Sequence, residues 1–426
     1  MTAVSSASGA WDPLLTGHMH TAARDAAALI ARAVQRMDAR AVAQGSPALG
    51  SGLAGVAVFL HYAGRLLPDV RSGERANELL DQAAAALEAV PLAPSLYTGF
   101  AGVAWSFAHL CREGFLTSNI DLSDIDVALS DHIRQRARAD AYDLILGLVG
   151  YGVYFLERLP SPAGRAGLEL VVDVLEQTAE CALDGVCWRT PQALLPLHRR
   201  NVFPDGYYDL GLAHGIPGVM AFLAAVSQAG VAADRCNLLM ERSLTWLWQQ
   251  RLPAGAESAF PCFVAAGRGP TPTSSRAAWC YGDPGVAMAI LACARATGDQ
   301  AVAARASMLL AEAHRRSATE SGVVDACLCH GASGLGHLFN RAFQVTRDPS
   351  LRRAAVRWFE VALGLRQHDK GVGGFAYGHS DGRGRPIELR AEPGVLVGAA
   401  GVGLALLAAI TQREPAWDRM LLLGFV

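Results

Sequence analysis

The chain has 426 residues, of which 51% are hydrophobic and 18% are charged, with 44 glycines and a formal net charge of -2. This composition supplies enough apolar side chains for a large core and excludes an intrinsically disordered polypeptide. The near-zero net charge, without a long basic run, argues against nucleic-acid binding. The sequence therefore indicates a folded globular protein.

The N-terminal residues 1–13 contain neither the basic nor the apolar segment of a secretory signal, which predicts a cytoplasmic protein. The longest apolar stretch, residues 395–410, is shorter than a membrane span and contains three glycines, so it is expected to be a packed internal helix. Nine cysteines in such a chain favour reduced thiols, a metal site or catalysis over a disulfide framework.

A Gly-x-x-Gly motif recurs along the chain and opens a strongly apolar segment each time. The first glycines of successive motifs are 47, 48, 68, 67, 49 and 67 residues apart. Regular self-similarity of this length predicts a helical repeat architecture. The seven motifs begin and end at Gly52 and Gly55, Gly99 and Gly102, Gly147 and Gly150, Gly215 and Gly218, Gly282 and Gly285, Gly331 and Gly334, and Gly398 and Gly401.

Each repeat has room for two helices. Segments directly after the motifs, such as residues 56–60 and 219–223, are apolar nearly all round, as expected of inner helices buried on both sides. Segments between them, such as residues 75–90, are amphipathic and are expected to form outer helices. The sequence thus predicts an all-α fold, an α/α toroid over residues 14–426. Most of the motif glycines are interpreted as packing devices at crowded helix starts.

The long interval between Gly150 and Gly215 has a different composition from the repeats around it. Residues 187–191 and 199–208 are rich in proline, glycine and aromatic side chains. We expect an inserted subdomain in this interval, loop-rich or partly β, with a peptide-facing surface.

Three repeats carry reactive residues just before the glycine motif, and their shared register would bring them to one end of the ring. Cys280, Cys329 and His330 offer two thiolates and an imidazole, ligands that Zn²⁺ prefers. Three protein ligands leave a fourth position open, which is typical of a catalytic zinc site. Buried packing of the cysteines and histidine is the alternative, and Cys327 could replace Cys329 as a ligand.

Other polar residues occupy neighbouring positions. His214 precedes its glycine motif directly and suits proton transfer near neutral pH, with a zinc ligand or a core histidine as alternatives. Arg276 lies four residues before Cys280, close enough to reach the metal's substrate if that segment is helical. A buried Asp143 would need a partner such as Arg276 or His214. Nucleotide-binding and serine-hydrolase motifs are absent from the sequence.

Three motifs together resemble those of the lanthionine synthetase C-like family, the lanthipeptide cyclases. They are residues 213–218, 276–285 and 329–334, and the glycine repeats extend the resemblance from about residue 50 to residue 423. The resemblance implies an α/α toroid with a central Zn²⁺ held by Cys280, Cys329 and His330. It also implies that an inserted domain of SH2-like character, present in some bacterial members, would fall within residues 159–208.

The resemblance further implies that His214, Asp143, Arg276 and Tyr281 surround the metal as catalytic residues, with Asp143 matched through the looser motif at residues 142–150. The implied activity adds precursor-peptide cysteine thiols to dehydroalanine or dehydrobutyrine and so forms lanthionine and methyllanthionine rings. Expected partners are the dehydrated precursor, leader plus core, its dehydratase and an export transporter. We expect a stand-alone cytoplasmic enzyme that meets the membrane only through such a complex.

Three rival functions remain open at this point. A glutathione-adding member of the same superfamily would use the same zinc site on proteins that contain dehydroamino acids. An α/α-toroid glycosidase would need two positioned carboxylates, and no acidic pair stands out at the repeat ends. A non-catalytic scaffold would keep the zinc for stability and recruit a precursor or transporter.

Overall fold

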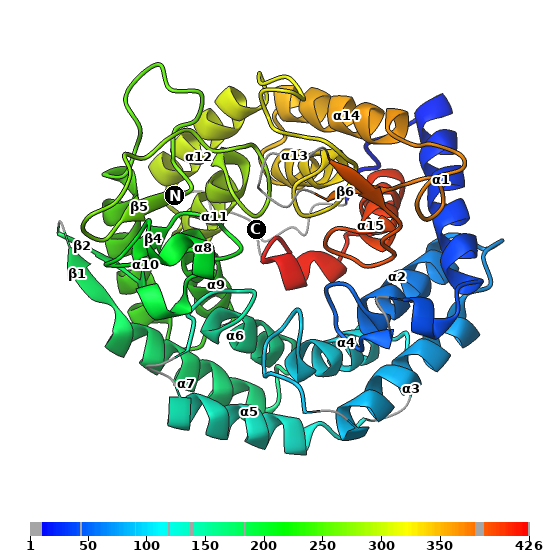
Figure 1. The fold of residues 1–426 in the computed structure, drawn as a ribbon, viewed down its shortest axis with the longest axis horizontal. Coiled ribbons are helices and arrows are strands. Elements are labelled where there is room, and N and C mark those ends of the chain that lie inside the picture. The colour runs from blue at the N-terminus through cyan, green and yellow to red at the C-terminus, as the bar shows by residue number, and fades with distance from the viewer. Residues whose placement is uncertain are drawn as a thin grey trace, which may run out of the picture.

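The computed structural model describes residues 11–42, 45–89, 91–117, 120–136, 140–182, 184–379 and 387–424. Helices form two concentric rings around one axis (Figure 1). The inner ring consists of α2 (Leu53–Leu66), α4 (Phe100–Arg112), α6 (Leu148–Glu157), α9 (Ile216–Gln228), α11 (Asp283–Thr297), α13 (Ala332–Thr346) and α15 (Ala399–Ile410). The outer ring consists of α1 (Gly17–Gln35), α3 (Gly73–Ala89), α5 (Ser123–Arg136), α7 (Pro162–Thr178), α10 (Ala233–Trp248), α12 (Gln300–Ala313) and α14 (Pro349–Gly364).

Both rings follow from the side-chain patterns of their helices. Every residue of α15 is buried, in line with its uninterrupted apolar sequence. In α3, by contrast, burial is confined to Ala76, Leu79, Leu80 and Ala83, one face of an amphipathic helix. Successive inner helices contact each other and α15 contacts α2, so the inner ring closes, while α1 covers α15 from outside. The predicted α/α toroid is confirmed. Among the described helices, none is long and apolar enough to cross a membrane.

The motif glycines permit close backbone approach at the start of each inner helix. The first glycine is the N-cap in all seven repeats, and the second lies under a carbonyl oxygen six residues earlier in the chain. A Cβ atom on Gly102 would lie 1.7 Å from the Leu96 oxygen, which no side chain tolerates. The interpretation of these glycines as packing devices is confirmed.

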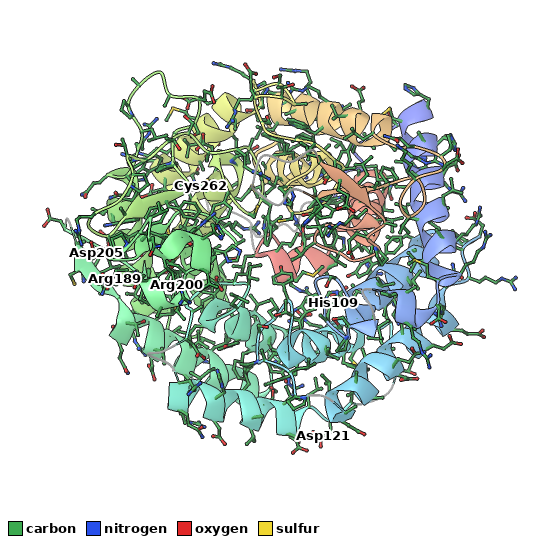
Figure 2. All side chains as sticks on the ribbon, viewed as in Figure 1. His109, Asp121, Arg189, Arg200, Asp205 and Cys262 are labelled. Atoms are coloured by element: carbon green, nitrogen blue, oxygen red, sulfur yellow. The ribbon has the colours of Figure 1, made fainter. Side chains whose placement is uncertain are left out.

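All three long repeats carry short antiparallel strands. The interval after Gly150 holds β1 (Glu180–Ala182), β2 (Gly185–Cys187), β3 (Arg189–Thr190) and β4 (Tyr207–Asp209), the next holds β5 (Phe263–Ala265), and the last holds β6 (Tyr377–His379) and β7 (Glu388–Arg390). Strand β5 pairs with β4, so the sheet β3-β4-β5 joins two repeats. Figure 2 shows Arg189, Arg200 and Asp205 on this side of the ring.

The interval expected to hold an inserted subdomain is therefore divided. Its first part forms α7, an outer helix that packs on α5 and α6, and the strands begin only at Glu180. The strands and loops that follow, with the short helices η3 (Gln192–Leu194) and α8 (Leu197–Arg200), match the expected loop-rich or partly β character. Its status as a separate SH2-like subdomain stays a prediction.

A C-terminal plug, residues 414–423, lies inside the ring (Figure 1). Its short helix η4 (Trp417–Leu421) accepts hydrogen bonds from the hydroxyl of Tyr97 at Met420 O, 2.6 Å, and from Nε1 of Trp279 at Leu421 O, 3.0 Å. Asp418 and Arg419 form buried ion pairs with inner helices. The plug thus ties inner helices together from within.

Candidate metal centre and its surroundings

Backbone hydrogen bonds join equivalent residues of neighbouring repeats into one belt around the bore. The residue two positions before each glycine motif bonds to its counterpart in the neighbouring repeat at five places around the bore. The donor and acceptor pairs are Ala213 to Cys280, Cys280 to Cys329, Cys329 to Leu396, Leu396 to Gly50, and Gly50 to Tyr97, at N to O distances of 2.8 to 3.4 Å. This belt brings side chains that are far apart in sequence to the same ring of backbone.

The belt contains two of the three predicted metal ligands, and the third follows directly. The ligand atoms of Cys280, Cys329 and His330 all lie within 4.8 Å of one another. Cys280 is buried, whereas Cys329 and His330 are partly exposed. Two thiols and an imidazole in this arrangement fit a zinc ion that keeps an accessible fourth position.

The electrostatics of the cluster favour an ionised thiol. A hydrogen bond from Cys329 holds the pKa of the Cys280 thiol well below its usual range; burial opposes the shift, and His330 and the charge of Arg276 support it. The same shared hydrogen, together with burial, raises the pKa of Cys329 well above its usual range. These opposite shifts favour ionisation of Cys280 over ionisation of Cys329.

A second set, Asp325, Cys327 and His330, also has its ligand atoms within 4.8 Å. The Asp325 carboxylate is engaged with backbone, however, since Oδ1 accepts the Cys327 amide and Oδ2 accepts the Gly378 amide, both at 2.8 Å. Burial raises the pKa of Cys327 well above its usual range. The set with Cys280 and Cys329 therefore fits a metal better than the set with Cys327.

His214 and Asp143, from adjacent repeats, contact each other. Nδ1 of His214 lies 2.8 Å from Oδ2 of Asp143. Burial lowers the pKa of His214, but the hydrogen bond to Asp143 and the charges of Asp143 and Asp209 outweigh it, so this pKa lies above its usual value. Of the two partners considered for Asp143, the structure selects His214. The pair provides an oriented imidazole that keeps its proton to a higher pH than an isolated histidine side chain does.

Tyr281 contacts a buried carboxylate, Asp209, that was not predicted from the sequence. Its ring stacks on His214 with centroids 6.0 Å apart, and its hydroxyl donates to Oδ2 of Asp209 at 2.8 Å. Asp209 is buried, and burial raises its pKa to about 7, against the charge of His214 and the hydrogen bonds it accepts. The repeat pattern contains a signal for Asp209, because it lies six residues before its glycine motif, as Asp325 and Glu392 do before theirs. All three accept the amide two residues on.

Arg276 occupies the same register position, six residues before its motif, and its side chain is exposed. Its charge lowers the pKa of Cys280 and acts in the same direction on Cys329. Arg276 is therefore close to the thiols and open to a ligand above them. All seven predicted site residues thus lie just before the starts of four consecutive inner helices, α6, α9, α11 and α13.

Three comparisons with known proteins bear on this arrangement. A family model described as Lanthionine synthetase C-like protein matches residues 44–422. Nisin biosynthesis protein NisC from Lactococcus lactis subsp. lactis is 24% identical over 266 residues, 57% of this chain and 61% of that protein, so the match spans less than two thirds of the relative.

Among solved structures, nisin cyclase superposes with a TM-score of 0.72 at 19% identity and covers 92% of this chain and 94% of its own. A cellobiose 2-epimerase from Bacillus thermoamylovorans B4167 gives a TM-score of 0.45 at 12% identity over 72% of this chain and 85% of its own. The nisin cyclase match shows a shared fold.

Proposed function

Because the chain belongs to the lanthionine synthetase C-like family, we propose that it is a zinc-dependent lanthipeptide cyclase. The reaction adds a peptide cysteine thiol across the double bond of a dehydroalanine or dehydrobutyrine. A bond forms between sulfur and the β-carbon, and the α-carbon receives a proton in place of the one the thiol loses, so the peptide mass is unchanged.

The proposal rests mainly on one juxtaposition, a soft-ligand cluster beside an oriented histidine-carboxylate pair at the mouth of one bore. Cys280, Cys329 and His330 would hold the zinc, which when bound supplies a Lewis acid that lowers the pKa of a substrate thiol. The donor set suits this chemistry, because two thiolates make zinc a weak generator of hydroxide and a good holder of a third sulfur.

The surrounding residues have assigned parts in the proposal. His214, with its raised pKa, donates the proton to the α-carbon, and Asp143 fixes the ring through Nδ1. The exposed guanidinium of Arg276 stabilises the negative charge that develops on the carbonyl oxygen of the dehydroamino acid. Tyr281 is positioned by Asp209 and packs against the His214 ring.

The test uses a synthetic peptide with one cysteine and one dehydroalanine, with and without a zinc chelator. Since ring closure leaves the mass unchanged, thiol alkylation followed by mass spectrometry reports the loss of free thiol. We expect the peptide to lose its alkylatable thiol only when both the protein and Zn²⁺ are present. A parallel incubation with glutathione separates the rival function, because its addition increases the mass of the peptide. Retention of the free thiol in every arm, with no increase in peptide mass in the glutathione arm, would reject both functions, and peptide binding without reaction would favour the scaffold.

A further inference from the structure

A basic pocket of about 480 Å³ lies between helix α1 and the loop that follows α14. Helix α1 and its C-cap residue contribute Leu29, Arg32, Ala33 and Arg36, whose spacing places them on one helix face. The loop contributes a second set of side chains: Arg366, His368, Asp369 and Lys370. Four cations and one carboxylate therefore line one concave site in a chain whose net charge is -2.

The loop is held in a fixed shape against α1. Gly371, Gly373 and Gly374 all have positive φ angles, and a Cβ atom on Gly373 would lie 2.7 Å from Cα of Ile30 in α1. Nε of Arg366 donates to Gly373 O at 3.3 Å, and the Gln367 amide donates to Gly374 O at 2.7 Å. The pocket wall is thus preorganised, which lowers the cost of binding a ligand.

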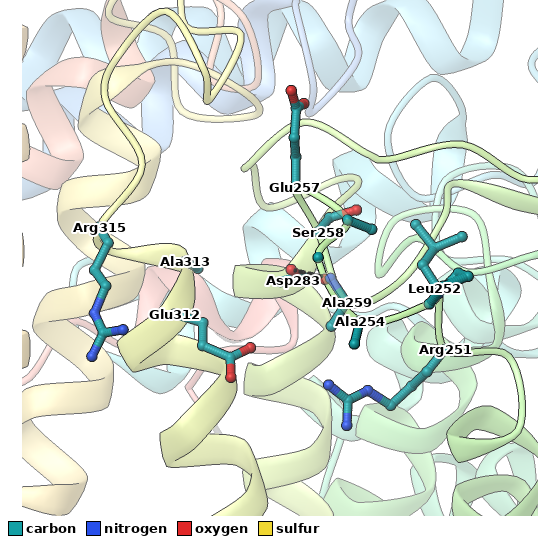
Figure 3. Close-up of a pocket in the computed structure, with 13 residues that line it drawn as sticks. Arg251, Leu252, Ala254, Glu257, Ser258, Ala259, Asp283, Glu312, Ala313 and Arg315 are labelled. Atoms are coloured by element: carbon teal, nitrogen blue, oxygen red, sulfur yellow. Dashed lines mark hydrogen bonds between the residues drawn. The ribbon is translucent and has the colours of Figure 1, made fainter.

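Most of the positive charge of the basic pocket is not neutralised within the protein. Arg32 pairs with Asp69 at 3.2 Å. Among the described residues, no ion pair joins Arg36 or Lys370 to a carboxylate. A second cavity, of about 560 Å³, lies beside α12 and differs in this respect, because two arginines and three acidic residues line it (Figure 3). Of these two cavities, the basic pocket is the one with the charge to select an anion.

The basic pocket is connected to the metal centre by a short length of chain. The loop runs directly into β6, where the Gly378 amide is bound by Asp325 and the Tyr377 ring lies 6.1 Å from that of His330, centroid to centroid. Gly373 and Gly378 are five residues apart, so they are separated by at most about 18 Å. An extended peptide of about six residues therefore bridges this distance.

We propose that the basic pocket binds an acidic segment of the peptide substrate, which carries aspartate or glutamate about six residues from the cysteine that reaches the metal centre. The inference rests on the proposed function for the identity of the ligand as substrate. Carboxylates match Arg36, Arg366 and Lys370 in charge and hydrogen-bonding geometry. Docking there would raise the local concentration of the nearby cysteine at the metal centre.

The test exploits the fact that Lys370 is the only lysine of the chain. An amine-reactive acylating reagent therefore labels one side chain besides the N-terminus, and peptide mapping quantifies it. The probe is a dodecapeptide with three aspartates about six residues from a serine that replaces the cysteine. Its partner has asparagine at the same positions. We expect only the aspartate peptide to slow Lys370 labelling, with less protection at 1 M salt, where charges are screened.

Fluorescence anisotropy with the same labelled peptides tests the pocket residues. Arg36→Gln with Lys370→Gln should weaken binding of the aspartate peptide about tenfold, from the sum of two exposed charge pairs. The matched control is Arg136→Gln with Arg353→Gln, two exposed arginines on outer helices away from the pocket, which should bind as the parent does.

Three results would overturn the proposal: equal binding of both peptides, equal loss in the control variant, or protection of Lys370 by inorganic phosphate at concentrations where the aspartate peptide gives none. The probe cannot react, so binding is measured independently of cyclisation. Loss of the proposed function would appear instead as failure of ring closure with peptide binding intact.

Discussion

Two buried carboxyl groups at opposite ends of the bore show how the ring divides its tasks. Glu157, beside the C-terminal plug, is 3% exposed and Asp209, beside the metal centre, is 1% exposed. Burial alone would raise both pKa values, yet the pKa of Glu157 falls to about 2 because His109 and Arg419 lie against it. The pKa of Asp209 rises to about 7, since no cation bonds to it directly.

The difference extends to the surroundings of each carboxyl. At the plugged end, Arg419 bonds to Glu157 and Glu113, both at 2.8 Å, and Arg341 bonds to Asp418 through two nitrogens. At the metal end, Asp143 and Asp209 bond to an imidazole or to neutral partners, and the side chains of His214 and Tyr281 that they contact are partly exposed. Compensated charges therefore stabilise one end, while the other retains groups able to change protonation near neutral pH.

Removing a ligand at the metal end should give the largest effect. Cys280→Ala is expected to reduce the rate of ring closure more than about 1000-fold. Loss of a residue that only supports a metal ligand typically costs roughly 10- to 100-fold in activity, and loss of the ligand itself should cost more. Stability of the metal-free protein should change by about 1 kcal/mol or less. Thiol alkylation, metal analysis and urea unfolding measure these effects. Cyclisation at the parent rate would exclude Cys280 as a ligand.

Breaking the plugged end should affect stability instead. Asp418→Ala leaves the buried guanidinium of Arg341 without its bidentate partner, and the free energy of unfolding should fall by about 3 to 5 kcal/mol. Metal content of the folded fraction should be unchanged. Urea unfolding provides the measurement, with Asp124→Ala on the exposed face of α5 as the control. A loss comparable to that of the control would show that the plug is not needed for stability.

The sequence predicts much of the metal end and almost none of the plugged end. Cys280, Cys329 and His330 share a repeat register, and the backbone belt converts that register into proximity, so local pattern suffices. The ion pairs of Asp418 and Arg419 depend on where the C-terminal segment returns inside the ring. No periodicity encodes such long-range contacts.

Two features of the metal end were also not predicted from the sequence. Strands of three residues, such as β4 and β5, are too short to show alternation, so their pairing between repeats was not foreseen. Pairing of Asp143 with His214 joins positions 71 residues apart, and the sequence left Arg276 as an equal candidate. The packing of the segments that carry Asp143, His214 and Arg276 decides which partner Asp143 takes.

Within the metal end, substitution in the His214–Asp143 pair should slow ring closure less than substitution of a metal ligand. His214→Asn is expected to slow ring closure by about 100- to 1000-fold, in the range of general acid catalysis, with metal content unchanged. The control is His132→Asn, which breaks a similar pair with Asp140 at 2.5 Å on the outer side of the ring. Full activity of His214→Asn would exclude it as the proton donor.

Acid should weaken the plugged end selectively. The pKa of Glu157 is lowered in the folded protein, so its contribution is present above its unfolded value of 4.5 and lost as pH falls toward about 2. That contribution is about 3 kcal/mol. Glu157→Gln should remove this part of the pH dependence, measured by urea unfolding between pH 6 and 3, whereas Glu74→Gln on α3 should not. Parallel curves for Glu157→Gln and the parent would contradict the assignment.

The smallest effect sharpens the comparison at Asp209. Its negative charge raises the pKa of His214, so Asp209→Asn should lower that pKa and leave less protonated donor at alkaline pH. The alkaline limb of the pH-rate profile should move to lower pH, so the reaction at pH 8 should slow, by a smaller factor than in His214→Asn. Glu392→Gln is the matched control, since Glu392 occupies the same register and accepts the Gly394 amide at 3.1 Å in a repeat without site residues. If both variants kept the parent limb, Asp209 would be only a turn-capping residue like Glu392, and the contrast with Glu157 would be one of structure alone.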